Sequence, residues 1–158
     1  MGGLFFVRTY KMEKEAQPLR ERSMFKAAHL AKAALLYAED HEKFPGGFSW
    51  NKQLAPYGIK GVDLQTPVGS WSRYSMRRDS ERQSKAALRD PGTYLLFLDG
   101  FGSGGSSMFP VDLEMAWQVT PYRRKGTPGN VFSFADGHAA FVPQKDWNPE
   151  ETDKGPVR

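Results

Sequence analysis

The sequence contains no cysteine among its 158 residues. This absence excludes a disulfide framework, a thiolate metal site and a cysteine nucleophile. The three histidines, His29, His41 and His138, do not have the spacing of a metal-binding motif. Long apolar runs are also absent: Leu4–Val7 is stopped by Arg8, whereas a membrane span needs ~20 apolar residues. We therefore expect no membrane insertion by the chain as given, and no signal peptide in this run.

The composition is that of a folded globule. A hydrophobic share of 39% is enough for a core, while 16 glycines and 11 prolines indicate many loops. The formal net charge of +4 favours anionic partners only weakly. The length suits one domain, which we place at residues 18–143. Residues 1–17 are interpreted as a lead-in segment and residues 144–158 as a flexible acidic tail.

One long helix is predicted from Pro18 to His41. Apolar residues recur there with the helical period and form one broad face suited to burial. Pro18 suits the first helical position, where no amide donor is needed, and the run Phe44–Gly47 ends the helix. Before it, Leu4–Tyr10 is compatible with a strand or an early helical turn, and Lys11–Glu15 with a solvated helical extension.

Short apolar runs of strand length follow the helix. They are Trp71–Met76, Tyr94–Leu98, Leu113–Val119, Val131–Phe134 and Ala139–Val142. One helix followed by several strands predicts an α+β fold, in which one long N-terminal helix packs on an antiparallel β-sheet.

Two Asp-Gly pairs end apolar runs and are interpreted as structural turns. Asp136 and Gly137 separate the last two strands, which predicts a hairpin with a type I′ turn. Asp99 and Gly100 resemble this pair, and we expect both aspartates to set turns through side-chain to backbone bonds. Arg77–Asp90 is interpreted as an exposed, mobile connection, and Phe101–Ser107 as a flexible loop.

Candidate chemistry is sparse. Asp99, Asp136 and His138 could serve a small hydrolase, and the two aspartates with loop carbonyls could hold Ca²⁺, but neither set has a recognised spacing. We therefore predict no catalytic residue, no metal and no cofactor. A second hypothesis is a surface that binds nucleic acid or acidic glycan. Its candidate anion-binding residues are Arg73, Arg77, Arg78, Arg123, Arg124 and Lys125.

A series of motifs resembles one known family. The series runs in order through Leu35–Asp40, Phe44-Pro45, Trp50, Leu54–Tyr57, Tyr74–Met76, Phe97–Asp99 and Asn130–His138. These motifs resemble the bacterial type IV pilin-like and pseudopilin proteins. The likeness is to the branch whose C-terminal motif is a His, nine residues and then Asp-Gly. The resemblance implies a pilin-like head domain.

The chain departs from the family pattern at three points. Gly126 stands where the His of the motif belongs, and Thr66 stands where a Cys is usual. Arg8 occupies the place of the first mature Glu, and the apolar half-helix that anchors family members is missing. Within this resemblance we expect the chain to be either a soluble head from a longer precursor or a relative that no longer assembles through that helix.

The resemblance implies a structural subunit, not an enzyme, of a type II secretion or type IV pilus-like system. Its implied partners are other pilin-like subunits and the secretion machinery. Its implied location is the cell envelope, on the periplasmic face, or the extracellular space.

Overall fold

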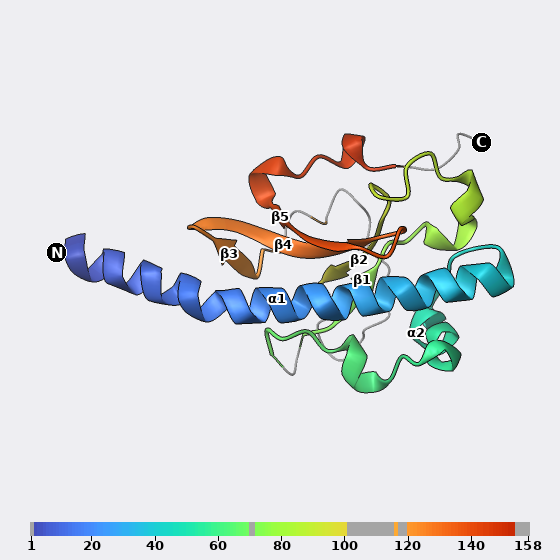
Figure 1. Ribbon diagram of the computed structural model, residues 1–158, viewed down its shortest axis with the longest axis horizontal. Helices are drawn as coiled ribbons and strands as arrows, with labels where there is room; N and C mark the ends of the chain where they lie inside the picture. The colour runs from blue at the N-terminus through green and yellow to red at the C-terminus, as the bar shows by residue number, and fades with distance from the viewer. Residues whose placement is uncertain (1, 70–71, 101–115, 117–119, 154–158) are drawn as a thin grey trace.

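The computed structural model describes residues 2–69, 72–100, 116 and 120–153, and for residues 2–16 it describes the backbone alone. Within this part of the chain lie two α-helices and five β-strands (Figure 1). The helices are α1 (Gly2–His41) and α2 (Trp50–Leu54). The strands are β1 (Tyr74–Met76), β2 (Leu95–Asp99), β3 (Tyr122–Arg124), β4 (Thr127–Phe134) and β5 (Ala139–Pro143).

The five strands form one antiparallel sheet with β4 at its centre. Along one edge β4 pairs with β5, from Gly129 opposite Pro143 to Ser133 opposite Ala139. Its other edge pairs with β3 near the start of β4 and with β2 near the end, and β1 pairs with the far side of β2. The predicted α+β arrangement, one long helix on an antiparallel sheet, is confirmed.

Part of α1 lies over the sheet (Figure 1), and this part buries a face made largely of alanine. Ala27, Ala31 and Ala34 are fully buried, together with Leu30. Small side chains let the helix approach the strands closely, and the larger side chains of the sheet, including Phe97, fill the space between them. This face is the one that the 3.6-residue period predicted.

The opposite face of the sheet has its own, smaller core. Leu95, Leu98, Phe132 and Phe134 form this cluster with Ala116. A register shift between residues 95 and 97 is a bulge in β2 and explains why apolar residues do not simply alternate along that strand. Phe132 and Phe134 share one face of β4, and it is the face turned away from α1.

The C-terminal segment helps cover this second core. Gln144–Asp146 and Pro149–Glu151 form 3₁₀ turns, and the Trp147 ring lies 4.9 Å from the Phe132 ring, edge to face. Thr152 and Asp153 are buried. The tail was expected to fray, whereas it is packed as far as residue 153, because an apolar sheet face lies beneath it.

The start of the helix was predicted wrongly. α1 begins at Gly2, so that Leu4–Tyr10 is helical and Pro18 lies inside the helix instead of at its first position. The residues between 11 and 17 are mostly strong helix formers, which offset the hydrogen bond lost at Pro18. α1 is bent where it extends beyond the sheet (Figure 1), as a proline inside a helix favours. None of the described helices combines the length and apolar character needed to cross a bilayer.

The β4–β5 hairpin is present, but its turn is not type I′. Gly137 has a φ of +92°, and no positive φ occurs at Asp136. The Gly137 amide donates to the Phe134 carbonyl at 2.9 Å, which is the pattern of a three-residue loop ending in a left-handed residue. Positive φ at two successive turn residues, the signature of type I′, occurs instead at Lys125 and Gly126 between β3 and β4.

Three other predictions lie wholly or partly outside the described residues. They concern the loop Phe101–Ser107, the strand Leu113–Val119, of which only the buried Ala116 is described, and Trp71 at the start of the first predicted strand.

We predict that Gly137→Ala destabilises the protein more than Gly126→Ala. Both residues have positive φ, where a Cβ costs roughly 1–2 kcal/mol. At Gly137 the added Cβ would also lie 3.2 Å from Leu35 Cδ1, whereas at Gly126 it meets nothing within 4 Å. Chemical denaturation of both variants measures the difference, and equal losses would show that the turn does not pack tightly on α1. Asp136→Asn should cost less than either, since Asn suits the same turn.

Candidate functional site

A buried carboxylate joins the helix to the sheet. Asp99 is the last residue of β2 and is fully buried, as are Ser23 of α1 and Tyr74 of β1, while Tyr122 of β3 is 2% exposed. These four side chains come from four different elements. Together they form one polar cluster within the core.

One carboxylate oxygen accepts two short hydrogen bonds. The Ser23 hydroxyl and the Tyr122 hydroxyl each donate to Asp99 Oδ2 at 2.5 Å. Because the Ser23 proton is committed to Asp99, the Tyr74 hydroxyl is the donor toward Ser23, where its one proton is shared between Oγ at 2.9 Å and the backbone carbonyl at 3.3 Å. The Thr66 hydroxyl faces the carboxylate and favours its ionised form. Oδ1 has no hydrogen-bond partner among the described residues.

The pKa values in the cluster are governed by burial. Burial raises the pKa of Asp99, and the hydrogen bonds from Ser23 and Tyr122 only partly offset this. Burial also raises the pKa of Tyr74 and of Tyr122, and the negative charge of Asp99 adds to both shifts. Both tyrosines are therefore held as proton donors, which is the form that a buried carboxylate requires.

The backbone around Asp99 is held equally firmly. The Asn130 side chain donates to the Asp99 carbonyl at 2.8 Å, and the Ser75 hydroxyl donates to the Gly100 carbonyl at 2.6 Å. Gly100 has a φ of +102°, so the chain turns at the Asp-Gly pair as expected. Among the described residues, the hydrogen bonds to the Asp99 carboxylate come from other elements and not from the turn, which is not the role expected of this side chain.

Sequence reasoning missed Ser23, Tyr74 and Tyr122 as partners of Asp99. One signal was present: Ser23 lies four residues before Ala27 and seven before Leu30, so it is a polar residue on the apolar stripe of the helix. A polar residue in that position needs a buried partner. Nothing local marked the two tyrosines, which reach Asp99 only through the pairing of the strands.

Asp136 and His138 form a separate pair in the β4–β5 turn. Their side chains are hydrogen-bonded to each other, and the Asp136 carboxylate also accepts from the His138 amide at 3.1 Å. Burial alone would raise the pKa of Asp136, but its bonds to His138 outweigh this and lower it. The side-chain bond to the backbone is the turn-setting role that the sequence predicted for Asp136.

The two aspartates do not share a site. Gly137, in the middle of the turn, lies against Lys32 and Leu35 of α1, whereas Asp99 meets the helix at Ser23. Nine helical residues correspond to about 13 Å. The three residues of the hydrolase hypothesis therefore do not converge, and the Ca²⁺ hypothesis loses the shared ligand set that it required.

The candidate anion-binding residues are divided by the fold. Arg123, Arg124 and Lys125 are exposed on the β3–β4 hairpin. The guanidinium of Arg20 on α1 donates to the Arg123 carbonyl at 2.6 Å, which fixes this hairpin to the helix. The guanidinium of Arg124 lies 5.4 Å from the centre of the Phe141 ring. These three cations form a defined surface, which we call the basic hairpin.

Arg77 does not belong to an exposed surface. It is 1% exposed, its guanidinium lies 3.8 Å from the centre of the Tyr94 ring, and its Nη1 donates to the Asp153 carbonyl at 2.9 Å. It also forms a salt bridge with Asp79. Arg73 is half-buried and Arg78 is exposed. The expected mobile connection thus begins with a buried arginine that holds the C-terminal segment.

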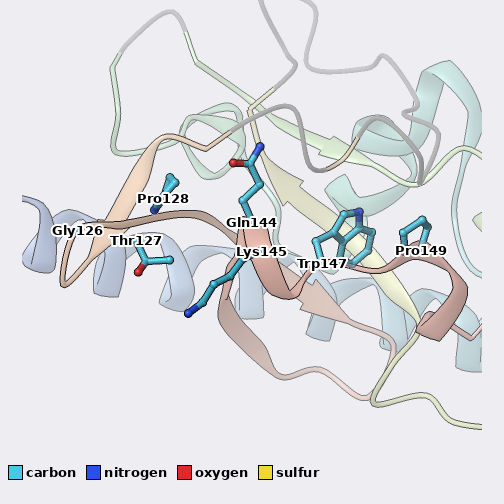
Figure 2. Close-up of a pocket in the computed structure, with 7 residues that line it drawn as sticks. All are labelled: Gly126, Thr127, Pro128, Gln144, Lys145, Trp147 and Pro149. Carbon is cyan, nitrogen blue, oxygen red and sulfur yellow. The ribbon is translucent and has the colours of Figure 1, made fainter.

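An open groove of ≈ 850 Å³ lies between the start of β4 and the C-terminal segment (Figure 2). Its walls are largely apolar, with Pro128 on one side and Trp147 and Pro149 on the other, and Lys145 is the charged residue among those that line it. This residue set contains no acid–base pair and no group of metal ligands.

No family model matches this chain, and no curated protein or solved structure was found to match it either.

We predict that Asp99→Asn removes part of the pH dependence of stability. Because burial raises the pKa of Asp99, the folded state binds this proton more tightly than the unfolded state. The contribution of Asp99 is therefore greatest below about pH 4, its ordinary pKa, and is lost as pH rises through the raised pKa. Urea denaturation from about pH 4 to about pH 8 should show a shallower decline for the variant.

Asp136→Asn is the matched control for this experiment. The pKa of Asp136 is shifted in the opposite direction, so its contribution to stability is lost only as pH falls toward about 4 and below, and its variant should not show the shallower decline at higher pH. A curve for Asp99→Asn that runs parallel to the wild type would contradict the assignment of the pH dependence to Asp99.

Proposed function

We propose that this protein is a pilin-like or pseudopilin-like structural subunit of a bacterial type II secretion or type IV pilus-like system, and not an enzyme. The observation that carries this proposal is the form of α1. This single helix of 40 residues packs with its C-terminal part on the sheet and extends with its N-terminal part beyond it (Figure 1).

A helix that leaves its own domain is suited to packing against other subunits. An isolated helix of about 15 residues is marginal in water, because most helical stability comes from tertiary packing. The sequence of the extending part includes Leu4, Phe5, Phe6 and Val7. A neighbouring subunit would supply the contacts that such a segment needs.

The motifs that carry the resemblance agree with a structural role. Phe44, Trp50, Leu54, Tyr74 and Phe97 are all buried. Their side chains build the core, and Tyr74 also supports the buried Asp99 cluster that joins the helix to the sheet. The motifs thus consist of residues that determine the fold and not of catalytic residues, which supports a structural role for the protein.

The expected partners are therefore other pilin-like subunits, with the secretion machinery as a further partner. The expected location is the cell envelope or the extracellular space.

Anion binding remains a second candidate function, and the basic hairpin favours it. Arg123, Arg124 and Lys125 are consecutive, exposed and held by a tight turn. Arg20 lies beside them through its bond to the Arg123 carbonyl. Such a cluster can contact successive phosphates of nucleic acid or the acidic groups of a glycan.

The structural proposal is tested in cells that produce the protein with its natural flanking sequence. The tagged protein should sediment with sheared filaments or with the envelope fraction. Phe6→Glu should reduce this sedimentation, whereas Val62→Glu, at a side chain that is 64% exposed on the head, should not. Both variants should keep the thermal stability of the wild type. A wild-type protein found only outside these fractions would refute the proposal.

The anion-binding candidate is tested by titrating the purified protein with a DNA duplex at several salt concentrations. If the basic hairpin binds phosphates, affinity should fall steeply with salt, and Arg123→Ala/Arg124→Ala/Lys125→Ala should reduce the slope by up to about three. Arg78→Ala, an exposed arginine outside the hairpin, is the control. Absence of binding at low salt would eliminate this function.

A further inference from the structure

The outward face of α1 carries one continuous ridge. Its residues are exposed and follow one another at intervals of three and four. We call this row the outer ridge, and its members are Arg22, Phe25, His29, Lys32, Leu36 and Glu39. Phe25 is 79% exposed and Leu36 is 49% exposed, and both are among the few large apolar side chains on the described surface.

The spacing of the outer ridge is that of a two-helix seam. Alternating steps of three and four residues form the heptad pattern by which one helix packs along another. On α1 this pattern lies opposite the alanine face that packs on the sheet. Its two apolar members, Phe25 and Leu36, are exposed, while Lys32 also lies beside the turn at Gly137. Figure 1 shows α1 running along the length of the domain, so the ridge extends over several helical turns.

The outer ridges of two copies are complementary when the two helices run antiparallel. If two copies cross antiparallel about a point midway between Leu30 and Ala31, residues 25 and 36 lie at equal distances on either side of that point. Phe25 of each copy then meets Leu36 of the other. By the same symmetry residue 22 meets residue 39, so Arg22 of each copy meets Glu39 of the other.

Only the antiparallel arrangement pairs the ridge favourably. A parallel pair in register would place arginine against arginine at position 22 and glutamate against glutamate at position 39, which is repulsive. The antiparallel pair instead gives two apolar contacts and two ion pairs, arranged about a twofold axis, and places His29 of each copy against Lys32 of the other at the centre. Such a self-complementary patch is what an isologous dimer requires.

We propose that the outer ridge is a docking surface for a second copy of this chain, bound antiparallel with Phe25 against Leu36. This inference does not depend on the proposed function. The seam is short compared with a standard interface, so the dimer is weak and forms roughly between 10 µM and 1 mM. It is held by two symmetric sets of contacts.

Disulfide trapping tests the register. The chain has no cysteine of its own, so every disulfide comes from the introduced residues. The Phe25→Cys/Leu36→Cys variant should give covalent dimers under mild oxidation, because the thiol introduced at position 25 of each copy would face the thiol introduced at position 36 of the other. Phe25→Cys alone should not, since eleven residues of helix separate the two positions by about 16 Å, beyond the limit of about 7 Å between Cα atoms.

Charge reversal tests the ion pairs by sedimentation of the purified chain. Arg22→Glu and Glu39→Arg should each weaken the dimer roughly five-fold, because each creates two like-charged contacts. Arg22→Glu/Glu39→Arg should restore wild-type association. Circular dichroism melting confirms that each variant is folded.

Four results would overturn the proposal. The first is a monomer at about 1 mM, and the second is a single Phe25→Cys variant that crosslinks as well as the double variant. The third is a double charge reversal that does not restore association. The fourth is a set of ridge variants that change binding to anionic vesicles while sedimentation is unaltered. The second result would mean a parallel pair, and the fourth a membrane-facing ridge.

Discussion

The Asp99 carboxylate is the constraint on which the arrangement of helix and sheet depends. A buried carboxylate is costly unless donors surround it. Here the donors to Asp99 come from α1 and β3, while β1 supports the serine that bonds to it. An alanine face alone would let α1 slide or rotate over the strands at little cost. The bond from Ser23 fixes the position of the helix along its axis and its rotation, because one residue must meet one carboxylate.

A second polar centre, around Arg77, holds the C-terminal segment on the domain. Arg77 lies over the Tyr94 ring and holds the carbonyl of Asp153, while the carboxylate of Asp153 accepts from the Asp90 amide at 2.5 Å. Three segments that are far apart in the sequence meet at this arginine. Planar guanidinium groups suit this use, since one group can stack on a ring and donate in several directions.

The sequence was sufficient for features that depend on neighbouring residues. The helical period identified the buried face of α1, and the Asp-Gly pair identified the β4–β5 hairpin. Features that depend on distant residues could not be foreseen. Arg77 lies in a charged stretch of sequence and was therefore predicted to be exposed, but the C-terminal segment covers it. The apolar face beneath Trp147 forms only when the strands pair. The turn between β4 and β5 was assigned the wrong type because the Asp-Gly pair does not reveal how many residues the loop contains.

The start of α1 was predicted wrongly for a different reason. Pro18 is equally compatible with the first turn and with a bend inside a longer helix, and only the residues before it decide between these. The candidate site shows the same limit: Asp99 could be named from the sequence, but its partners come from three other elements. Pairing of strands, not local pattern, brings them together.

The central position of β4 has a consequence for synthesis of the protein. α1 ends at residue 41, but the strand that organises the sheet ends at residue 134, about ninety residues later. At ribosomal rates of roughly 5–20 residues per second, the alanine face of the finished helix waits about 5–20 seconds for its sheet. During that interval the nascent helix has an uncovered apolar side and an unpaired serine. A chaperone that binds amphipathic helices would meet this chain early, and would be displaced only when β4 arrives.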